Sequence, residues 1–256
     1  MDEQLTYTAV KPREERIPDV VDFARDCMGF YPDSRQEELL RGTERRVVVK
    51  AARMWGKSTI AVVKVLHAAW QRPNDKVLMV CATQAECTRM KEWLALERNR
   101  LGIAGRVEVV TGRGMKFRRV DVAVIDDAAR VKDEIYDALR PAVAAARGEL
   151  WLLSTPGKQE GFFFEAWKRG KWTKVQAGAN DTPHMAAEFL AEEEAELGAV
   201  RYSSEYLCEF EGEVEVEYVL EYLDEKGEVW ARYGSNIDWS LGRDGPWKGY
   251  AEDKEK

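Results

Sequence analysis

Residues 46–59 of the chain read RVVVKAARMWGKST. The first part, 46–51, is a nearly continuous apolar run, which is typical of a strand that is covered on both faces of a parallel sheet. Residues 57–70 have the apolar spacing of a helix, and a glycine-bearing turn separates the two segments. A buried strand that passes through such a turn into a helix predicts a βαβ unit and an α/β fold.

The turn has the residue types of a phosphate-binding loop. In such a loop, backbone N–H groups and the helix N-terminus surround the phosphates, the lysine reaches the β and γ phosphates, and the serine hydroxyl binds Mg²⁺. Lys57 and Ser58 hold these positions, and Gly56 allows close approach of the backbone. Ala51 replaces the first glycine of the usual pattern, so an ordinary strand-to-helix turn with an exposed lysine is the alternative.

The rest of the first two-thirds repeats the alternation of strands and helices. Further strands are predicted at 76–82, 106–110, 120–126 and 149–154, and helices at 17–28, 35–42, 133–140 and from Thr83, where Thr83 and Glu86 fit a capping box. Beyond residue 161 we expect an aromatic-rich helix, a strand at 172–177 and helices at 186–197 and 199–207. Residues 213–233 alternate and predict a β-hairpin that turns at 224–227.

An acidic pair follows one of the apolar strands, in the stretch 122–127 (VAVIDD). An aspartate at the end of a buried strand beside the phosphate loop can hold the Mg²⁺ ion, and the next carboxylate can orient the attacking water. We therefore assign Asp126 to the metal and Asp127 to the catalytic base. The alternative is that both aspartates only cap the next helix.

These motifs together resemble the ATPase domain of the large terminases of tailed viruses. Arg53 makes the loop RMWGKS, which is similar to their deviant phosphate loop, and VAVIDDAA resembles their acidic-pair strand. The resemblance continues in the adenine-reading segment with Tyr31, Pro32 and Gln36, the coupling motif at 152–157 followed by GFF at 161–163, and the closing segment SEYLCEF at 204–210. The resemblance to the terminase ATPase domain therefore covers residues 31–210.

The resemblance implies a RecA-like (ASCE) P-loop ATPase that hydrolyses ATP with Mg²⁺ and packages double-stranded DNA into a procapsid. Its partners would be the portal, the small terminase and further copies of the chain in a ring, with a monomer expected in isolation. The expected domains are an ATPase core (1–160), a lid subdomain (161–212) and a hairpin with a tail (213–256). The implied nucleotide-binding residues are Gln36, Arg53, Met54, Trp55, Gly56, Lys57, Ser58, Thr59, Ser154 and Thr155; Ser58 and Asp126 hold the metal, and Asp127, Lys57 and Arg53 act in catalysis.

The chain departs from this family in two places. The second acidic residue is usually glutamate, whereas Asp127 is shorter by one methylene, and a misplacement of this order can cost ~100-fold in rate. The family also carries a Leu-Arg-Gly segment that supplies an arginine finger, an arginine that contacts the phosphates bound to a neighbouring subunit. Here residues 115–117 read MKF, so Arg118 or Arg113 is the candidate, and a solvated or DNA-facing charge is the alternative.

Composition limits the other possibilities. A net charge of −7 argues against a protein coated in basic surface, although basic residues outnumber acidic ones over 89–119. No apolar run approaches the ~18 residues of a membrane span, and no signal peptide is evident, so the host cytoplasm is expected. The four cysteines form no CxxC pair, which favours buried thiols over a zinc site. The content of Glu, Lys, Arg, Trp and Tyr fits a thermophilic source.

Residues 235–244 (SNIDWSLGRD) faintly resemble the first acidic strand of a terminase nuclease, with Asp238 at a metal position. One carboxylate cannot hold two metal ions, so no nuclease activity is expected. Two other functions remain open. A helicase-like DNA-dependent ATPase would need a second RecA-like domain, and a non-hydrolysing nucleotide-binding assembly adaptor would bind nucleotide without turnover.

Overall fold

The computed structural model describes residues 17–112, 116–182, 185–211, 222–223 and 229–231. The chain divides into two compact units, Met1–Glu211 and Gly212–Lys256. The candidate site residues that the structure describes all belong to the first unit.

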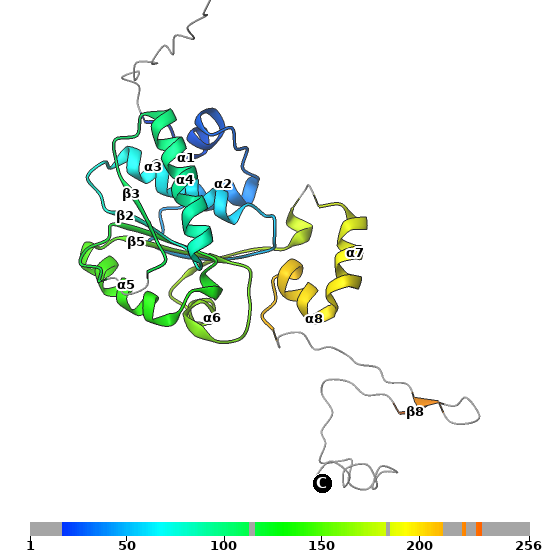
Figure 1. Ribbon diagram of the computed structural model, residues 1–256. Helices are drawn as coiled ribbons and strands as arrows, with labels where there is room; N and C mark the ends of the chain where they lie inside the picture. The colour runs from blue at the N-terminus through cyan, green and yellow to red at the C-terminus, as the bar shows by residue number, and fades with distance from the viewer. Residues whose placement is uncertain (1–16, 113–115, 183–184, 212–221, 224–228, 232–256) are drawn as a thin grey trace, which may run out of the picture. The chain divides into compact units, whose positions relative to one another are not determined.

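The first unit is built on a six-stranded sheet in the order β3-β2-β4-β5-β1-β6. Figure 1 shows helices on both sides of this sheet. The strands are β1 (Arg46–Ala51), β2 (Val77–Val80), β3 (Val107–Val110), β4 (Val122–Asp126), β5 (Glu149–Ser154) and β6 (Thr173–Ala177). Every neighbouring pair is parallel. The α/β fold class with a parallel sheet is therefore confirmed.

Helices cover both faces of the sheet. One hydrophobic cluster joins one face to α1 (Val20–Asp22), the π-helical turn η1 (Phe23–Cys27), α2 (Ser34–Arg41), α3 (Lys57–Gln71) and α4 (Gln84–Leu101). A second cluster joins the opposite face to α5 (Asp133–Ala146) and α6 (Gly161–Lys168). The apolar residues of β1 alternate between the two clusters, with Val47 and Val49 in the first and Val48 in the second, which explains why this strand reads as a continuous apolar run.

The helix starts follow the capping signals of the sequence. Thr83 and Glu86 form the predicted capping box of α4, and Asp33 and Gln36 form one at α2. The helix expected at 17–28 is instead the short α1 followed by η1, and the helix expected at 199–207 is α8 (Ala199–Tyr202) followed by the π-helical turn η4 (Ser203–Leu207).

The segment 161–177 differs from the expected domain division. We assigned it to the lid, but β6 pairs with β1 in the main sheet and α6 packs in its second hydrophobic cluster. The aromatic residues of this predicted aromatic-rich helix, such as Phe163 and Trp167, contribute to the same cluster. A separate small cluster around Ala179, Tyr202 and Tyr206 lies beyond residue 178. It is formed by η3 (Ala179–Asp181), α7 (Ala187–Leu197), α8 and η4, and we call these elements the lid.

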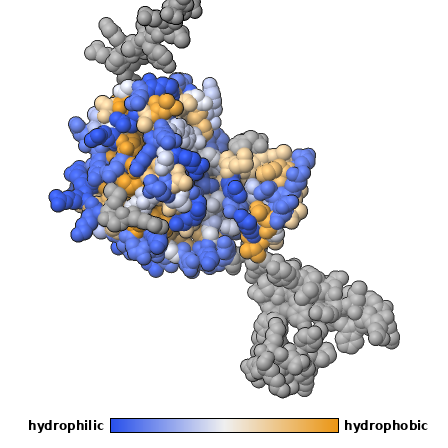
Figure 2. Space-filling model, in the orientation of Figure 1, coloured by the Kyte–Doolittle hydropathy of each residue, from blue (hydrophilic) through white to orange (hydrophobic). Residues whose placement is uncertain are grey.

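The surface of the first unit is polar over most of the face shown in Figure 2. The acidic stretch of the lid is part of this solvated surface, because Glu188, Glu192, Glu194 and Glu196 of α7 are exposed. In the second unit, β7 (Tyr222–Leu223) pairs antiparallel with β8 (Val229–Ala231), as a hairpin requires. The turn expected at 224–227 and Asp238 lie outside the described residues.

Candidate functional site

The predicted phosphate loop connects β1 to α3 at the carboxyl edge of the sheet. Gly56 has a φ of 92°, and Met54 is also left-handed, with a φ of 60°. A Cβ atom at Gly56 would lie 3.3 Å from Nε2 of Gln36, so glycine is favoured at this position both by its φ and by the neighbouring side chain. The loop therefore passes closely over the start of α3, where free backbone N–H groups favour an anion.

The side chain of Lys57 folds back over the loop. Its Nζ donates hydrogen bonds to the carbonyl oxygens of Ala51 at 2.9 Å and Ala52 at 2.8 Å. Burial lowers the pKa of Lys57, and the charge of Asp127 opposes this effect. The lysine therefore has partners within the loop itself, because the loop carbonyls point inward and attract the ammonium group.

Ser58 and Asp126 meet at the end of β4. The Ser58 hydroxyl donates to Oδ2 of Asp126 at 2.7 Å, while Oδ1 of Asp126 is buried without a hydrogen-bond partner. Burial raises the pKa of Asp126 to about 6. A hydroxyl and an unpaired carboxylate oxygen are ligands that Mg²⁺ prefers, so this pair fits the expected metal ion.

Asp127 lies beside this pair in a different setting. Its backbone is left-handed, with a φ of 51°, and its side chain is one-third exposed. Oδ2 of Asp127 lies 3.4 Å from a guanidinium nitrogen of Arg130, and the same nitrogen lies 3.0 Å from Oε1 of Glu86. In the sequence, Glu86 is marked only by the capping box of α4, and no motif marks Arg130.

The coupling motif begins in the last residues of β5, continues into the loop after it, and contacts two other segments. The buried Ser154 hydroxyl accepts a hydrogen bond from the backbone N–H of Ala129 at 3.2 Å, which ties the motif to the loop after Asp127. Thr155 is half-buried next to it. The Ser204 hydroxyl of the lid donates to the carbonyl oxygen of Pro156 at 2.8 Å. The coupling motif thus bridges the acidic pair and the lid.

The lid also contacts the phosphate loop. The backbone N–H of Arg53 donates to the carbonyl oxygen of Glu205 at 2.9 Å, and the two side chains approach to 3.9 Å between Nε and Oε2. Arg53, expected at the phosphates, therefore faces a lid glutamate that the sequence analysis did not select. Glu205 stands inside the closing segment SEYLCEF, which was the available signal for it.

Gln36 supports the phosphate loop. Its Nε2 donates to the carbonyl oxygen of Trp55 at 2.6 Å, and its Oε1 accepts from the backbone N–H of Asp33 at 2.9 Å. Both halves of the amide are therefore bonded within the protein, and each keeps one further donor or acceptor position, so contact with adenine stays a prediction. Tyr31, from the same segment, is 78% exposed.

Three further loop residues were predicted to bind nucleotide. The Trp55 side chain is 1% exposed and packs in the first hydrophobic cluster, so only its backbone can face a phosphate. Met54 is largely exposed, and Thr59 is half-buried on the first turn of α3.

Arg118, the arginine finger candidate, lies near the opposite edge of the sheet. It precedes β4, whose length of five residues corresponds to ~16 Å. It is exposed, whereas its neighbour Arg119 is paired with Asp121. Arg118 therefore cannot reach the phosphate loop of its own chain, and a finger role requires a neighbouring copy. Arg113 lies outside the described residues.

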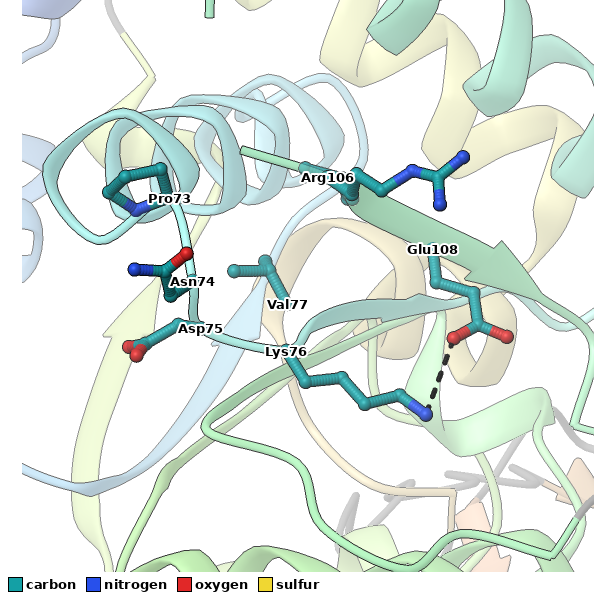
Figure 3. Close-up of a pocket in the computed structure, with 8 residues that line it drawn as sticks. Pro73, Asn74, Asp75, Lys76, Val77, Arg106 and Glu108 are labelled. Carbon is teal, nitrogen blue, oxygen red and sulfur yellow. Dashed lines mark ion pairs between the residues drawn. The ribbon is translucent and has the colours of Figure 1, made fainter. Parts of the chain in front are cut away.

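One hollow of the described surface lies away from these groups. It measures about 620 Å³ and is lined by residues at the amino ends of β2 and β3, including Pro73, Arg106 and the ion pair of Lys76 with Glu108 at 3.6 Å (Figure 3). A smaller hollow of about 370 Å³ lies beside Ala128 and Phe162. The candidate site is thus defined by the loop geometry and the acidic pair.

Comparison with known proteins relates this geometry to solved structures. No protein-family model and no curated protein matches the chain. The ATPase domain of the large terminase of Thermus phage P74-26 superposes with a TM-score of 0.66 at 17% identity, covering 75% of this chain and 99% of that one. A mutant form of the same domain gives 0.68 at 16% identity, covering 75% and 100%.

The chain has the fold of a large terminase ATPase domain. The large terminase of a second, thermophilic bacteriophage, solved in complex with ADP, has the same fold with a TM-score of 0.58 at 11% identity. That match covers 69% of this chain and 53% of the other chain. The resemblance drawn from the motifs is therefore matched in three dimensions by the terminase ATPase fold.

Within the part of the terminase fold that the structure describes, no group of three His, Cys, Asp or Glu side chains could hold a metal ion. Cys81, Cys87 and Cys208 are buried free thiols and Cys27 is half-buried. No described helix is both long enough and apolar enough to cross a membrane.

Proposed function

We propose that this chain is an ATP-hydrolysing motor that translocates double-stranded DNA into a viral procapsid. One observation carries the proposal. Lys57, Ser58 and Asp126 lie together at the carboxyl edge of a parallel sheet, in a chain that has the fold of a large terminase ATPase domain. The large terminase of the thermophilic bacteriophage, which has the same fold, has been solved with ADP and with ATP-γ-S.

The groups of the site suit phosphoryl transfer. Lys57 would exchange the carbonyl oxygens of Ala51 and Ala52 for the β and γ phosphates, because a phosphate offers the ammonium group a full negative charge. Ser58 and Asp126 would hold Mg²⁺, which neutralises charge on the phosphates when bound. Asp127 would orient the attacking water, and Arg53 would exchange Glu205 for a phosphate oxygen.

The partners follow from the motor role. An arginine finger from a neighbour can contribute ~10³–10⁵ in rate, so a chain that is monomeric in dilute solution would hydrolyse ATP slowly. Arg118 is the candidate, and this role requires a homo-oligomeric ring at a portal in the host cytoplasm, with the small terminase selecting the DNA. The exposed basic residues Lys116 and Arg118 are also candidates for contact with DNA phosphates.

ATP hydrolysis by the full chain, measured with and without double-stranded DNA, tests the proposal. Lys57→Ala should abolish turnover. The control is Lys171→Ala, which removes an exposed lysine outside the candidate site and should leave turnover unchanged. The unfolding midpoint of each variant should be recorded, because Lys57 also bonds the loop. Turnover that persists without Lys57 would refute the phosphate-loop assignment, and nucleotide binding without turnover in the wild type would favour the assembly adaptor.

A further inference from the structure

Two acidic side chains compete for one arginine beside the proposed catalytic base. The same Arg130 nitrogen lies 3.0 Å from Oε1 of Glu86 on α4 and 3.4 Å from Oδ2 of Asp127 at the end of β4. Arg130 is 59% exposed, whereas Glu86 is 18% exposed. The guanidinium is therefore the more exposed member, and it lies closer to Glu86 than to Asp127.

Glu86 is fixed by a second contact. Its other oxygen, Oε2, accepts a hydrogen bond from the backbone N–H of Thr83 at 2.9 Å, as part of the capping box. It lies in the first turn of α4, where the helix dipole favours a negative charge. Glu86 thus contacts Thr83 and Arg130 at the same time, which sets the position of Arg130 relative to Asp127.

We propose that Glu86 is a positioning residue that keeps Arg130 from closing on Asp127. This inference rests on the proposed function, in which Asp127 orients the attacking water. Two carboxylates share one positive charge, and the longer of the two distances leaves Asp127 with the weaker pairing. If Glu86 lost its charge, Arg130 would pair with Asp127 alone, and such pairs are frequently bidentate. A bidentate pair would use one lone pair on each Asp127 oxygen and neutralise the carboxylate charge, which would leave Asp127 a poorer acceptor for the attacking water.

The first test is a pair of substitutions in the full chain. Glu86→Gln keeps an oxygen that can accept from Thr83, so the cap is preserved while the charge is removed. We expect kcat for ATP hydrolysis to fall about fivefold while KM stays unchanged. About fivefold is the largest effect that a partly exposed ion pair usually has on an equilibrium or a rate. In an Arg130→Gln background the same Glu86→Gln change should have no effect on kcat. Glu92→Gln, at an exposed position of the same helix, is the matched control.

Two results would overturn the inference. An equal loss in both backgrounds would show that Glu86 acts independently of Arg130. A loss of ~10³-fold or more in Arg130→Gln alone would identify Arg130 as a residue that contacts the phosphates.

A second readout does not depend on hydrolysis and so separates this inference from the proposed function. The coupling between Asp127 and Arg130 can be measured from the unfolding equilibria of Asp127→Asn, Arg130→Gln and the double variant. The coupling is expressed as a ratio of unfolding equilibrium constants. We expect this ratio to be about fivefold larger when the cycle is measured in the Glu86→Gln protein than in the protein with Glu86. No rise would refute the inference even in a chain that hydrolyses ATP, and a rise would support the positioning role even in one that does not.

Discussion

Replacing Asp126 with asparagine should stabilise the protein at neutral pH when no nucleotide is added. The reason is the environment at the end of β4, where Asp126 is buried, only one of its oxygens accepts from Ser58, and the other has no partner. A pKa of about 6 in place of the ordinary 3.8 means that the fold disfavours the ionised form. Asparagine removes the buried charge and keeps an oxygen that can accept from Ser58.

The magnitude follows from the pKa of Asp126. The difference between 3.8 and about 6 corresponds to about 3 kcal/mol against ionisation in the folded protein. The new amide NH₂ group would be buried without a partner, at a cost of about 1–2 kcal/mol. The net gain above pH 6 is then about 1–2 kcal/mol, or roughly 2–8 °C in the unfolding midpoint of a unit of this size.

The sign of the pH dependence is specific. Because the folded pKa of Asp126 lies above the unfolded value, the folded protein binds the proton more tightly. This carboxyl therefore lowers stability progressively as pH rises from about 3.8 to about 6, and by a constant amount above that. Below pH 5 the advantage of asparagine should disappear.

Thermal unfolding of the wild type and of Asp126→Asn at pH 7.5 and pH 5 measures both effects. Asp137→Asn, at an exposed position of α5, is the control and should shift the midpoint little. The same Asp126 variant should lose Mg²⁺-dependent nucleotide binding. An Asp126 variant that is less stable than the wild type at pH 7.5 would refute the reasoning, because it would mean that the ionised carboxylate stabilises the fold.

Three further predictions concern other residues. Asp127→Asn should retain nucleotide affinity and lose turnover, and a variant as active as the wild type in steady-state assays would place the base elsewhere. If Arg118 is an arginine finger, Arg118→Ala should lower turnover at every salt concentration and should inhibit rings that mix it with the wild type. If Arg118 contacts DNA phosphates, the same variant should bind DNA less tightly and with a shallower salt dependence. Burial raises the pKa values of the Cys81 and Cys208 thiols to about 12, so at pH 8 a thiol reagent should modify half-buried Cys27 first and the buried cysteines only after denaturation.

The sheet and the outline of the phosphate site could be predicted because their signals are local. The apolar strand 46–51, the turn that ends at Gly56 and the aspartate that ends β4 each reveal their place within a few residues. The fold then brings Ser58 and Asp126 together, because both lie at the carboxyl edge of parallel strands.

The partners of the site residues could not be predicted, because they depend on contacts between distant segments. The bond from Gln36 to Trp55 and the contact of Arg53 with Glu205 join segments whose spacing carries no periodic signal. The lid boundary was wrong for a related reason. A short, partly exposed strand such as β6 resembles a lid element until its pairing with β1 is known.

These partners give the proposed motor a way to couple nucleotide binding to movement of the lid. The backbone N–H of Arg53 donates to Glu205, the two side chains form an ion pair at 3.9 Å, and Ser204 donates to Pro156 of the coupling motif. A phosphate that attracted Arg53 would compete with Glu205, which belongs to the same turn as Ser204. Because Ser154 in turn bonds the loop that follows Asp127, a change at the phosphates would reach the lid by two routes, through the phosphate loop and through the acidic pair.

A nucleotide that engaged Arg53 should therefore loosen η4, the turn that carries Glu205. Backbone hydrogen exchange over residues 203–207 should then be faster with ATP-γ-S than without it in the wild type, and the difference should disappear in Arg53→Ala. Equal exchange in the wild type with and without the nucleotide would exclude the route through Arg53.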